Sequence, residues 1–570
     1  MSTPTALNEP KPIAWIRVWH LVIVLATALV AGCATTLPPN TGRTPSKAIE
    51  SYGDTALGRL TEQRRTASAS RSDSGFMLLP GANEAMSSRL ALIDAAQRSL
   101  DLQYYAIHGD NSTELLLQKL RDAARRGVRV RVLIDDFNLV GKDAQVLRLA
   151  FEPNVEIRLF NPIAGSRSSL MGRAFTALAD LDRLQKRMHN KLFIADNAMG
   201  ITGGRNLGDA YFGSGDVSNF LDLDVLAAGR VVRDMSASFD HYWNDELAYP
   251  MQKLVSAQDL EDLRKLPAAS TAAPANAQQS APTAAPVTPK PVPVSTASQV
   301  MPDASPAAVV DADTGRMNLR TIPLVWAPSV LLADQPGKIG PGDDEVDAGE
   351  TLIDGLLSLM EQARQEVLIV SPYFVPGKPM MEVFARMRAK GVKVRVLTNS
   401  LASNDAPAAH AGYARYRTDL LALGVELHEM RADQEGTAAG AGLAGSGGGG
   451  RVATGSKASN SHSSLHAKAV TIDGRLAVIG SMNLDLRSQR QNSEVALAIR
   501  SPVLSQQLRK QFETTVTQGA YRLGLDENRQ LVWRAPPGAR FSDTRSEPDA
   551  TARQKALVFM IGPFAPDEML

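Results

Sequence analysis

Residues 189–206 read HNKLFIADNAMGITGGRN, and residues 466–483 read HAKAVTIDGRLAVIGSMN. In both stretches a lysine follows the leading histidine by two positions, an aspartate by seven, a glycine by fourteen and an asparagine by seventeen. The chain has 8 histidines among 570 residues, so two chance matches to the same set of spacings are not expected. We infer that the sequence contains two copies of one functional unit.

The two copies lie in halves of the chain that resemble each other. Residues 126–133, RGVRVRVL, match residues 390–397, KGVKVRVL, and each strand-like run follows a helical pattern that ends at glycine. Further strands are expected at 100–107, 155–160, 367–370 and 425–430. This order predicts an α/β fold made of a duplicated domain, in which each half is a mixed β-sheet flanked by helices.

Composition divides the chain into segments. Residues 266–312 are rich in proline and alanine and contain few charges, so they predict a disordered linker between the halves. The expected segments are a signal peptide at 1–32, a tether at 33–73, a first domain at 74–265, the linker at 266–312, and a second domain at 313–570 with a glycine-rich loop at 436–464.

The amino-terminal segment has the layout of a secretory signal. Lys11 and Arg17 precede the apolar run at 21–31, which is shorter than a membrane-spanning helix. The run leads to Cys33, the only cysteine, in the sequence Val-Ala-Gly-Cys, which resembles the bacterial lipobox. That resemblance implies lipidation of Cys33 and a lipid-anchored protein on the periplasmic side of the cell envelope, at the outer membrane. The alternative is a short membrane anchor with an incidental cysteine.

Overall charge does not point to a particular partner. The chain has 61 Lys and Arg against 60 Asp and Glu, a formal net charge of +1. A nuclease is expected to show a basic surface, and this balance gives no sign of one, so we expect no nucleic-acid partner. The single cysteine excludes an intramolecular disulfide framework and any cysteine-rich metal site.

The repeated unit suggests a site for an anionic ester. His189 and Lys191, like His466 and Lys468, are two residues apart in strand-like sequence, so each pair lies on one face. The aspartate has the opposite parity and should support the sheet, and the glycine should allow a tight turn that returns the asparagine. Two copies facing each other would form a cationic site between the halves that can hold a phosphodiester without a metal. We therefore expect no cofactor and no metal.

These stretches resemble the two HKD motifs of the phospholipase D superfamily. The second copy follows the family pattern through Arg487, Ser488, Asn492 and Glu494. The first copy departs from it: Gly204 stands where the family has serine, and the counterpart of Glu494 is assigned to Asp222, with Asp224 as a competing choice. Segments such as LDLQYYAI and SPYFVPG are most similar to bacterial cardiolipin synthases of the C-type branch.

The resemblance implies a role for each residue of the motifs. The family reaction proceeds through a phosphohistidine, with His189 expected as nucleophile and His466 as general acid and then base; the reverse assignment stays open. The remaining implied roles are phosphate neutralisation by Lys191 and Lys468, hydrogen-bond donation to substrate by Asn206, Asn483 and Ser481, and orientation of the histidines by Asp222 and Glu494. Asp196 and Asp473 complete the catalytic motifs, although a structural contribution is expected of them.

The implied activity is transfer of a phosphatidyl group to the alcohol of a second phospholipid, which makes a cardiolipin-type lipid. A hydrolytic phospholipase D, a phosphodiester nuclease and an inactive lipid-binding lipoprotein are the alternatives that the sequence leaves open. The expected partners are phospholipid substrates and the membrane that holds the anchor. The sequence does not show whether an accessory protein is needed.

Overall fold

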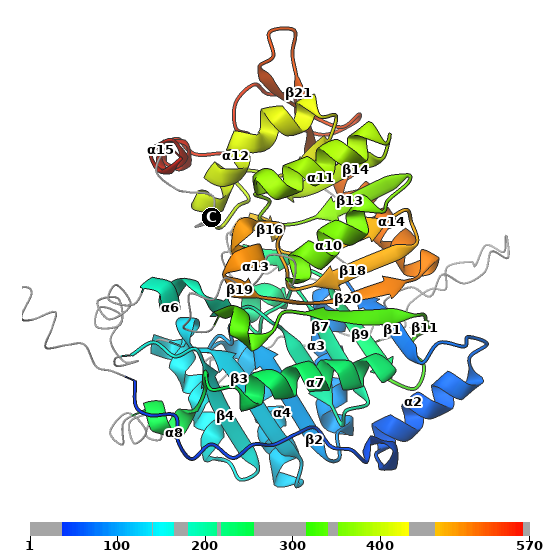
Figure 1. The fold of residues 1–570 in the computed structure, drawn as a ribbon, viewed down its shortest axis with the longest axis vertical. Coiled ribbons are helices and arrows are strands. Elements are labelled where there is room, and N and C mark those ends of the chain that lie inside the picture. The colour runs from blue at the N-terminus through cyan, green and yellow to red at the C-terminus, as the bar shows by residue number, and fades with distance from the viewer. Residues whose placement is uncertain are drawn as a thin grey trace, which may run out of the picture.

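The computed structural model describes residues 37–139, 141–164, 181–213, 218–255, 310, 315–339, 351–432 and 462–562. These residues form two large mixed sheets, one in each half of the chain, and Figure 1 shows one half below the other. The prediction of a duplicated α/β fold with mixed sheets is confirmed.

The first sheet has nine strands. Their order is β10 (Ala248–Pro250), β4 (Val155–Phe160), β3 (Arg129–Asp135), β2 (Ser99–Tyr104), β6 (Leu192–Ala195), β7 (Met199–Gly203), β9 (Asp224–Gly229), β1 (Ser74–Leu79) and β11 (Val325–Trp326). β2, β3 and β4 are parallel, and the other neighbours are antiparallel. The helices of this half are α2 (Ala56–Ala67), α3 (Ala82–Ala95), α4 (Asn111–Arg125), α6 (Leu181–Gln185), α7 (Arg230–Asn244) and α8 (Met251–Leu254).

The second sheet repeats this arrangement. Its order is β12 (Ser329–Ala333), β20 (Val495–Arg500), β18 (Leu476–Gly480), β17 (Ala469–Ile472), β13 (Glu366–Val370), β14 (Lys393–Asn399), β15 (Glu426–Met430), β21 (Ala520–Leu525) and β22 (Leu531–Arg534). β13, β14 and β15 are its parallel strands. The helices are α10 (Leu352–Glu361), α11 (Gly377–Ala389), α12 (Pro407–Ala422), α13 (Leu486–Arg490), α14 (Pro502–Gln518) and α15 (Ala552–Ile561).

The matched runs RGVRVRVL and KGVKVRVL form the same helix-to-strand connection in both halves. α4 is followed by Gly127 at φ +92°, and α11 is followed by Gly391 at φ +80°, a backbone region that favours glycine. The amide of Val128 then donates to the carbonyl of Ala123 at 3.1 Å, which closes the helix end and aims the chain into β3. The alternating valines of β3 and β14 are buried on one face of each sheet, and Leu133 and Leu397 are buried on the opposite face.

The two halves share one central apolar core. Inward side chains of the first sheet, such as Ile194 and Val225, lie in the same cluster as Ile479 and Leu497 of the second sheet. α7 and α14 add apolar side chains to this cluster, and β7 contacts β18 and β20 across it. Separate clusters under α3 and α4 and under α10 and α11 form the outer cores. The shared core fixes the two sheets against each other and thereby fixes what lies between them.

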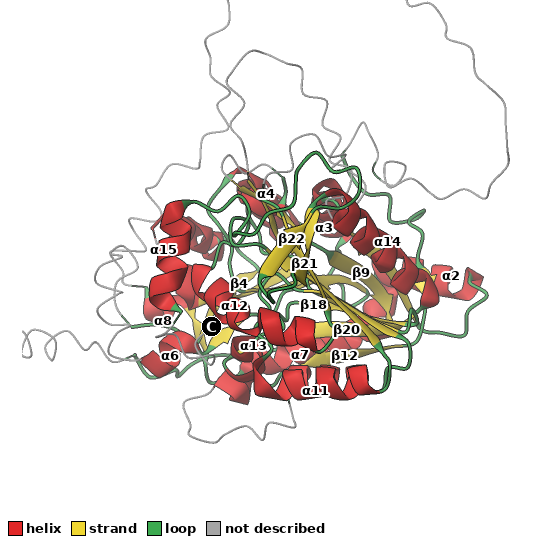
Figure 2. Ribbon diagram, turned by 90° about the horizontal axis from the view of Figure 1, so that it is seen from above, coloured by secondary structure: helices red, strands yellow, loops and turns green. Residues whose placement is uncertain are grey.

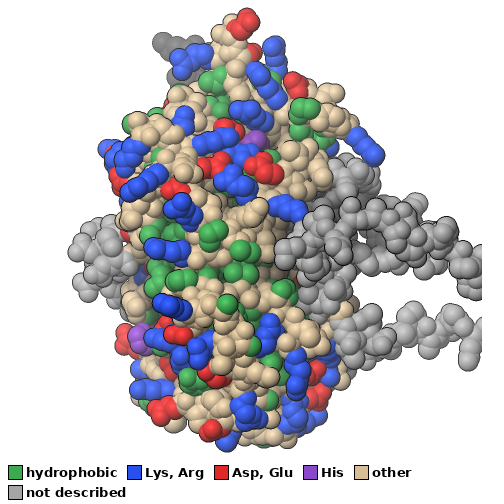
Figure 3. All heavy atoms as spheres, turned by 90° about the vertical axis from the view of Figure 1, so that its right-hand side faces the viewer, with side chains coloured by type: hydrophobic (Ala, Val, Ile, Leu, Met, Phe, Trp, Pro, Cys, Tyr) green, Lys and Arg blue, Asp and Glu red, His purple; other side chains and the backbone are tan. Residues whose placement is uncertain are grey.

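The surface carries charges of both signs. Figure 3 shows one face on which Lys and Arg side chains are interspersed with Asp and Glu, and hydrophobic side chains gather in a band at mid-height. Figure 2 shows helices on both sides of the strands when the molecule is seen from above. In the described part of the chain, no helix combines the length and the apolarity that crossing a membrane requires.

The expected tether at 33–73 is wrong for its described part. Residues 37–73 pack on the first half, and α2 contacts β9. The side chain of Asn244, on α7, accepts from the Ser46 amide at 3.0 Å and donates to the Ser46 carbonyl at 3.0 Å. The amide of Ala48 donates to Asp240 at 2.7 Å. The segment is ordered because its backbone polar groups find side-chain partners on a rigid helix. The expected signal peptide at 1–32 lies outside the described residues.

The expected start of the second domain at residue 313 also needs correction. β11 pairs with β1 of the first sheet, and Met317, Leu319 and Ile322 are buried in the outer core of the first half. The second half therefore begins after Trp326, because these apolar side chains are covered by the first half. Apart from Val310, the expected linker at 266–312 lies outside the described residues, as does the glycine-rich loop up to residue 461. Residues 462–464 belong to strand β16 (His462–Leu465) rather than to a loop.

The docked segment can be tested at Asn244. Asn244→Ala removes both hydrogen bonds to Ser46, so we expect a loss of about 1–3 kcal/mol in unfolding free energy and faster tryptic cleavage at Arg43 and Lys47. Thermal unfolding and a time course of limited proteolysis check this. The control is Asn528→Ala, since Asn528 bonds Asp526 through its backbone amide. Equal cleavage rates in the two variants would contradict the docking.

Candidate active site

Two short cross-pairings between the halves build the site. β5 (Arg187–Met188) pairs with β19 (Asn492–Ser493), and β8 (Ser218–Leu221) pairs with β16. The amide of His189 donates to the Ser493 carbonyl at 2.9 Å, and the amide of His466 donates to the Leu221 carbonyl at 2.8 Å. Each histidine is thus placed beside the acidic residue that follows its partner strand in the other half.

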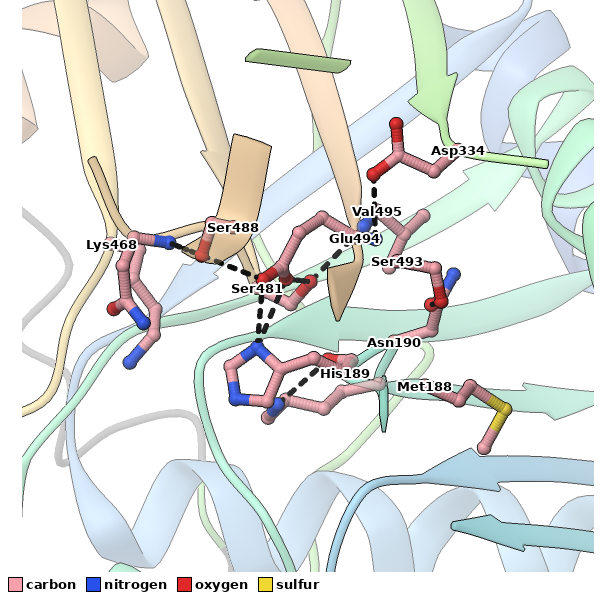
Figure 4. Close-up of polar contacts among 12 residues, drawn as sticks. Met188, His189, Asn190, Asp334, Lys468, Ser481, Ser488, Ser493, Glu494 and Val495 are labelled. Atoms are coloured by element: carbon pink, nitrogen blue, oxygen red, sulfur yellow. Dashed lines mark hydrogen bonds and ion pairs between the residues drawn. The ribbon is translucent and has the colours of Figure 1, made fainter. Parts of the chain in front are cut away.

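His189 is held by a carboxylate of the second half. Its Nδ1 lies 3.0 Å from both carboxylate oxygens of Glu494. The hydroxyls of Ser481 and Ser488 donate to the same carboxylate at 2.5 and 2.9 Å. Figure 4 shows the imidazole facing the Glu494 carboxylate, with Ser481 and Ser488 next to that carboxylate. The amide of Glu494 donates to Asp334, so its backbone is fixed as well.

His466 has the mirrored arrangement, with a carboxylate of the first half. Its Nδ1 lies 2.6 Å from Oδ2 of Asp222, and Oδ1 of Asp222 accepts from the Leu223 amide at 2.7 Å. The competing candidate, Asp224, is instead buried in an ion pair with Arg89 at 2.9 Å. Of the two candidates, Asp222 therefore contacts the histidine.

Asp222 lies 33 residues after His189, whereas Glu494 lies 28 residues after His466. Backbone hydrogen bonds explain how the two carboxylates still occupy equivalent positions. Gly204 donates its amide to the Leu223 carbonyl at 3.0 Å, and Ser481 donates its amide to the Val495 carbonyl at 2.9 Å. Gly204 and Ser481 are therefore equivalent, and so are the residues that precede Leu223 and Val495. The extra residues lie before this contact and do not change it.

The departure of the first motif from the family pattern is a matched pair of changes. A Cβ atom at Gly204 would lie 2.1 Å from Oδ1 of Asp222. In the second half the same position, Ser481, instead donates to the longer Glu494. The shorter aspartate reaches His466 only because Gly204 leaves space for it, so glycine and aspartate occur together here.

The two lysines are buried beside the histidines. Lys191 and Lys468 each donate to the carbonyl of the histidine two residues before them, at 2.8 and 2.6 Å. Burial lowers the pKa of Lys191 to about 7 and that of Lys468 to about 8. Neutralisation by a bound anion would favour their charged forms, so the pair suits an anionic ligand.

The two histidines have different electrostatic surroundings. Burial, together with Lys191 and Lys468, holds the pKa of His189 well below its usual range. Burial also raises the pKa of its partner Glu494 to about 7. For His466, burial and Lys468 lower the pKa while Asp222 opposes them. Burial would raise the pKa of Asp222, but His466 and Lys468 outweigh it and the pKa lies below its usual value. An ionised carboxylate therefore supports His466 more firmly than His189.

Both histidines line one cavity of about 390 Å³. Asn206 and Asn483 also line it, and the side-chain oxygen of Asn483, Oδ1, is buried without a hydrogen-bond partner among the described residues. The Asn206 amide donates to the Tyr211 hydroxyl at 3.0 Å. The geometry thus brings together His189, His466, Asn206 and Asn483, with Lys191 and Lys468 directly behind the histidines.

Three expectations about the motifs need correction. Ser481 was expected to bind substrate, but its hydroxyl donates to Glu494, so it supports the carboxylate. The motif glycines, Gly203 and Gly480, end β7 and β18 and were expected to make tight turns. Each instead permits close packing, because a Cβ atom would lie 2.3 Å from Asp224 Oδ1 in one case and 2.2 Å from the Val495 carbonyl in the other.

The motif aspartates hold backbone rather than facing the cavity. Asp196 accepts from the amides of three consecutive residues that lead into β2, and Asp473 accepts from three that lead into β13. Both residues adopt φ +52° at the turn after their strand. This is the supporting role expected from their parity, and it argues against a catalytic one.

Several cavity residues were not singled out from the sequence. Tyr105 packs edge-on against the His189 ring at 5.1 Å, and Tyr211 packs edge-on against the His466 ring at 5.3 Å. Asp405 and Asp485 also line the cavity, and Tyr373 donates to Asp405 at 2.8 Å. The one available signal was that Tyr211 closely follows the first motif; Asp405 comes from a loop with no motif.

A serine at position 204 should disturb the His466 site. Gly204→Ser forces Asp222 away, so we expect a loss of about 1–3 kcal/mol in stability and a change in the imidazole signals of His466 by NMR. The control, Gly474→Ser, is at φ +61° but has open space around it, so it should affect stability without changing these signals. An unchanged His466 spectrum in Gly204→Ser would contradict the matched pair.

In the described ranges, no group of three or more His, Cys, Asp and Glu side chains is arranged to hold a metal ion. Lys191 and Lys468, together with Arg487 in the cavity lining, give the site its positive charge.

Comparison with known proteins gives the same family as the two motifs. The family described as "Cardiolipin synthase, PLD-like domain" matches residues 90–243 and 356–516, together more than half of the chain. The chain is 35% identical to cardiolipin synthase C of Escherichia coli (strain K12) over 505 residues, which cover 87% of this chain and 96% of that protein. It is 22% identical to cardiolipin synthase A of Edwardsiella ictaluri (strain 93-146), covering 77% of this chain and 68% of the relative.

Among solved structures, the phosphatidylserine synthase of Haemophilus influenzae Rd KW20 is similar over 82% of this chain and 91% of that one, with a TM-score of 0.48 and 15% identity. The matched ranges of the family contain both histidine motifs with their carboxylate partners. The chain belongs to the cardiolipin synthase family of PLD-like proteins.

Proposed function

We propose that this protein transfers a phosphatidyl group from one phospholipid to the hydroxyl group of a second, through a phosphohistidine, and so makes a cardiolipin-type lipid. The observation that carries the proposal is the pair of histidines in one cavity, each held by a carboxylate of the other half. The 35% identity with cardiolipin synthase C over most of both chains supports this reaction among those of the superfamily.

The proposed reaction has two balanced steps. Nε2 of neutral His189 attacks phosphorus, the bond to the leaving alcohol breaks, and His466 gives that alcohol its Nε2 proton. His466 then takes the proton of the incoming lipid hydroxyl, whose oxygen attacks phosphorus and releases His189. Water in place of the lipid hydroxyl would give hydrolysis.

The electrostatics support His189 as the nucleophile. Its lowered pKa keeps the ring neutral, as attack requires, whereas the ionised Asp222 stabilises the protonated form of His466. Lys191 and Lys468 would neutralise the non-bridging oxygens, and Asn206 and Asn483 would donate hydrogen bonds to them. Asp222 and Glu494 would each fix the tautomer of one ring by accepting from Nδ1.

We further propose that the protein acts at the periplasmic side of the cell envelope, anchored to the outer membrane by lipid on Cys33. The motivation is the lipobox-like sequence that ends at this only cysteine. Cys33→Ser should leave the protein unprocessed or release it from outer-membrane fractions. Mass spectrometry of the mature protein checks the anchor, and a free Cys33 thiol would rule it out.

The decisive experiment offers the purified protein isotope-labelled phosphatidylglycerol and phosphatidylethanolamine in vesicles and resolves the lipid products by mass. Labelled cardiolipin is the expected product, and it should form in the presence of a chelator because Lys191 and Lys468 supply the positive charge. Phosphatidic acid as the only product would instead make the protein a hydrolase.

The two histidines should differ when the leaving group needs no proton. His189→Ala and His466→Ala should each lower lipid transfer by at least about 10³-fold. With a phosphatidyl ester of p-nitrophenol, His466→Ala should still release a burst of p-nitrophenol and trap the phosphohistidine, whereas His189→Ala should not. A burst in His189→Ala alone would reverse the two roles. Circular dichroism shows whether both variants are folded.

The pH dependence should follow the buried charges. Because the pKa of Glu494 is raised to about 7, its carboxylate forms as pH rises through that value. The lysines lose their protons as pH rises through about 7 and about 8. We therefore expect a bell-shaped profile of kcat/KM with its maximum at about 7, where Glu494 is half ionised and Lys191 is half protonated. Lys191→Arg, which keeps its charge, should lower the rate and shift the falling limb towards higher pH. An unshifted limb would assign it to another group.

A further inference from the structure

The end of α15 exposes a run of apolar side chains. Residues 557–561 read LVFMI, and five consecutive helical residues point around the whole helix rather than to one side. Leu557, Val558 and Ile561 are half-buried, whereas Phe559 is 81% exposed and Met560 is 60% exposed. They are the most exposed large hydrophobic side chains among the described residues. One side of α15 thus packs on the protein and the other side is left for a partner.

The charges on α15 favour an anionic partner. The helix contains Arg553 and Lys555 and has no acidic residue between its first and last positions. Arg553 and Lys555 thus lie next to the exposed Phe559 and Met560, and basic and apolar side chains side by side suit contact with anionic headgroups. α15 has 10 residues, far too few to cross a bilayer.

α15 is connected directly to the wall of the active-site cavity. It packs against α12, and the guanidinium of Arg415, on α12, donates to the Gly562 carbonyl at the end of α15. Ala408 and Ala409, in the first turn of α12, line the cavity. Ala408 and Arg415 are seven positions apart on the helix, about 10 Å along its axis. The exposed apolar end therefore lies close to the site.

The helices α6 and α8 lie on the same side of the molecule as α15. Figures 1 and 2 both show α15, α6 and α8 on the left, and α14 on the right. In Figure 1 the described chain begins on this left side, next to α8.

We propose that the exposed end of α15, with Phe559 and Met560 inserted in the headgroup layer, docks the protein on an anionic phospholipid surface beside the active-site cavity. This rests on the proposed function, since a lipid substrate must pass from a membrane into that cavity. The docking spares the lipid a passage through water and sets which side of the protein faces the bilayer.

The test places one fluorophore on each side of the full-length protein. In a Cys33→Ser background, Met560→Cys or Val503→Cys is labelled with an environment-sensitive dye. Val503, at the start of α14, is the matched control because it is 51% exposed and on the side opposite α15. The band of hydrophobic side chains in Figure 3 lies on that opposite side, which makes the control demanding.

With vesicles of phosphatidylglycerol and phosphatidylcholine, the dye at 560 should show a blue shift and brighter emission that fade in phosphatidylcholine alone, and the dye at 503 should show neither. The double variant Phe559→Ser/Met560→Ser should lose roughly tenfold or more in transfer with vesicles and keep its activity on a short-chain soluble phosphatidylglycerol.

The outcomes separate this proposal from the proposed function. No spectral change at 560, or the same change at 503, overturns the docking of α15 even if transfer is observed. A blue shift that needs only a higher protein concentration shows a second copy on α15 and overturns it too. Vesicle-dependent emission at 560 without any lipid transfer supports the docking and overturns the proposed reaction instead.

Discussion

Each proposed catalytic imidazole depends on a carboxylate that the other half of the chain supplies. Glu494 of the second half holds His189, and Asp222 of the first half holds His466. Neither motif histidine is paired with a carboxylate of its own half, so the site exists only while the two sheets are held together. The central apolar core, to which both sheets contribute, provides that constraint. The short strand pairs β5–β19 and β8–β16 then set the register between each histidine and its partner.

Burial gives the site its chemistry at a cost in solvation. Two lysines, two histidines and two carboxylates are all nearly inaccessible to solvent, which disfavours their charged forms. The histidine–carboxylate pairs between the halves offset part of this desolvation. The lowered pKa values of Lys191 and Lys468 show that the rest of the desolvation is not offset. A bound phosphodiester would supply the missing negative charge. The site is therefore arranged to bind an anionic group.

The duplicated halves are not electrostatically equal. Ser481 and Ser488 donate to the carboxylate that holds His189. The carboxylate that holds His466 belongs to the shorter Asp222 and fills the space beside Gly204 that a side chain would occupy. The firmly ionised Asp222 and the raised pKa of Glu494 give the two rings different proton affinities. Two histidines in equal surroundings could not divide the roles of nucleophile and acid so readily.

The sequence by itself determined the duplicated α/β fold and the His, Lys and Asn residues of the site, because periodicity and exact spacing record local geometry. β4 even has the expected bounds, Val155–Phe160. The roles of Ser481, Gly203 and Gly480 and the docking of residues 37–73 could not be read in this way, since they depend on contacts with residues far away in the chain. The choice between Asp222 and Asp224, the crossing of the histidine–carboxylate pairs and the entry of Asp405 into the cavity were likewise decided only by the tertiary structure. Spacing along a chain does not state which strands of two similar halves will pair, whereas packing of the shared core does.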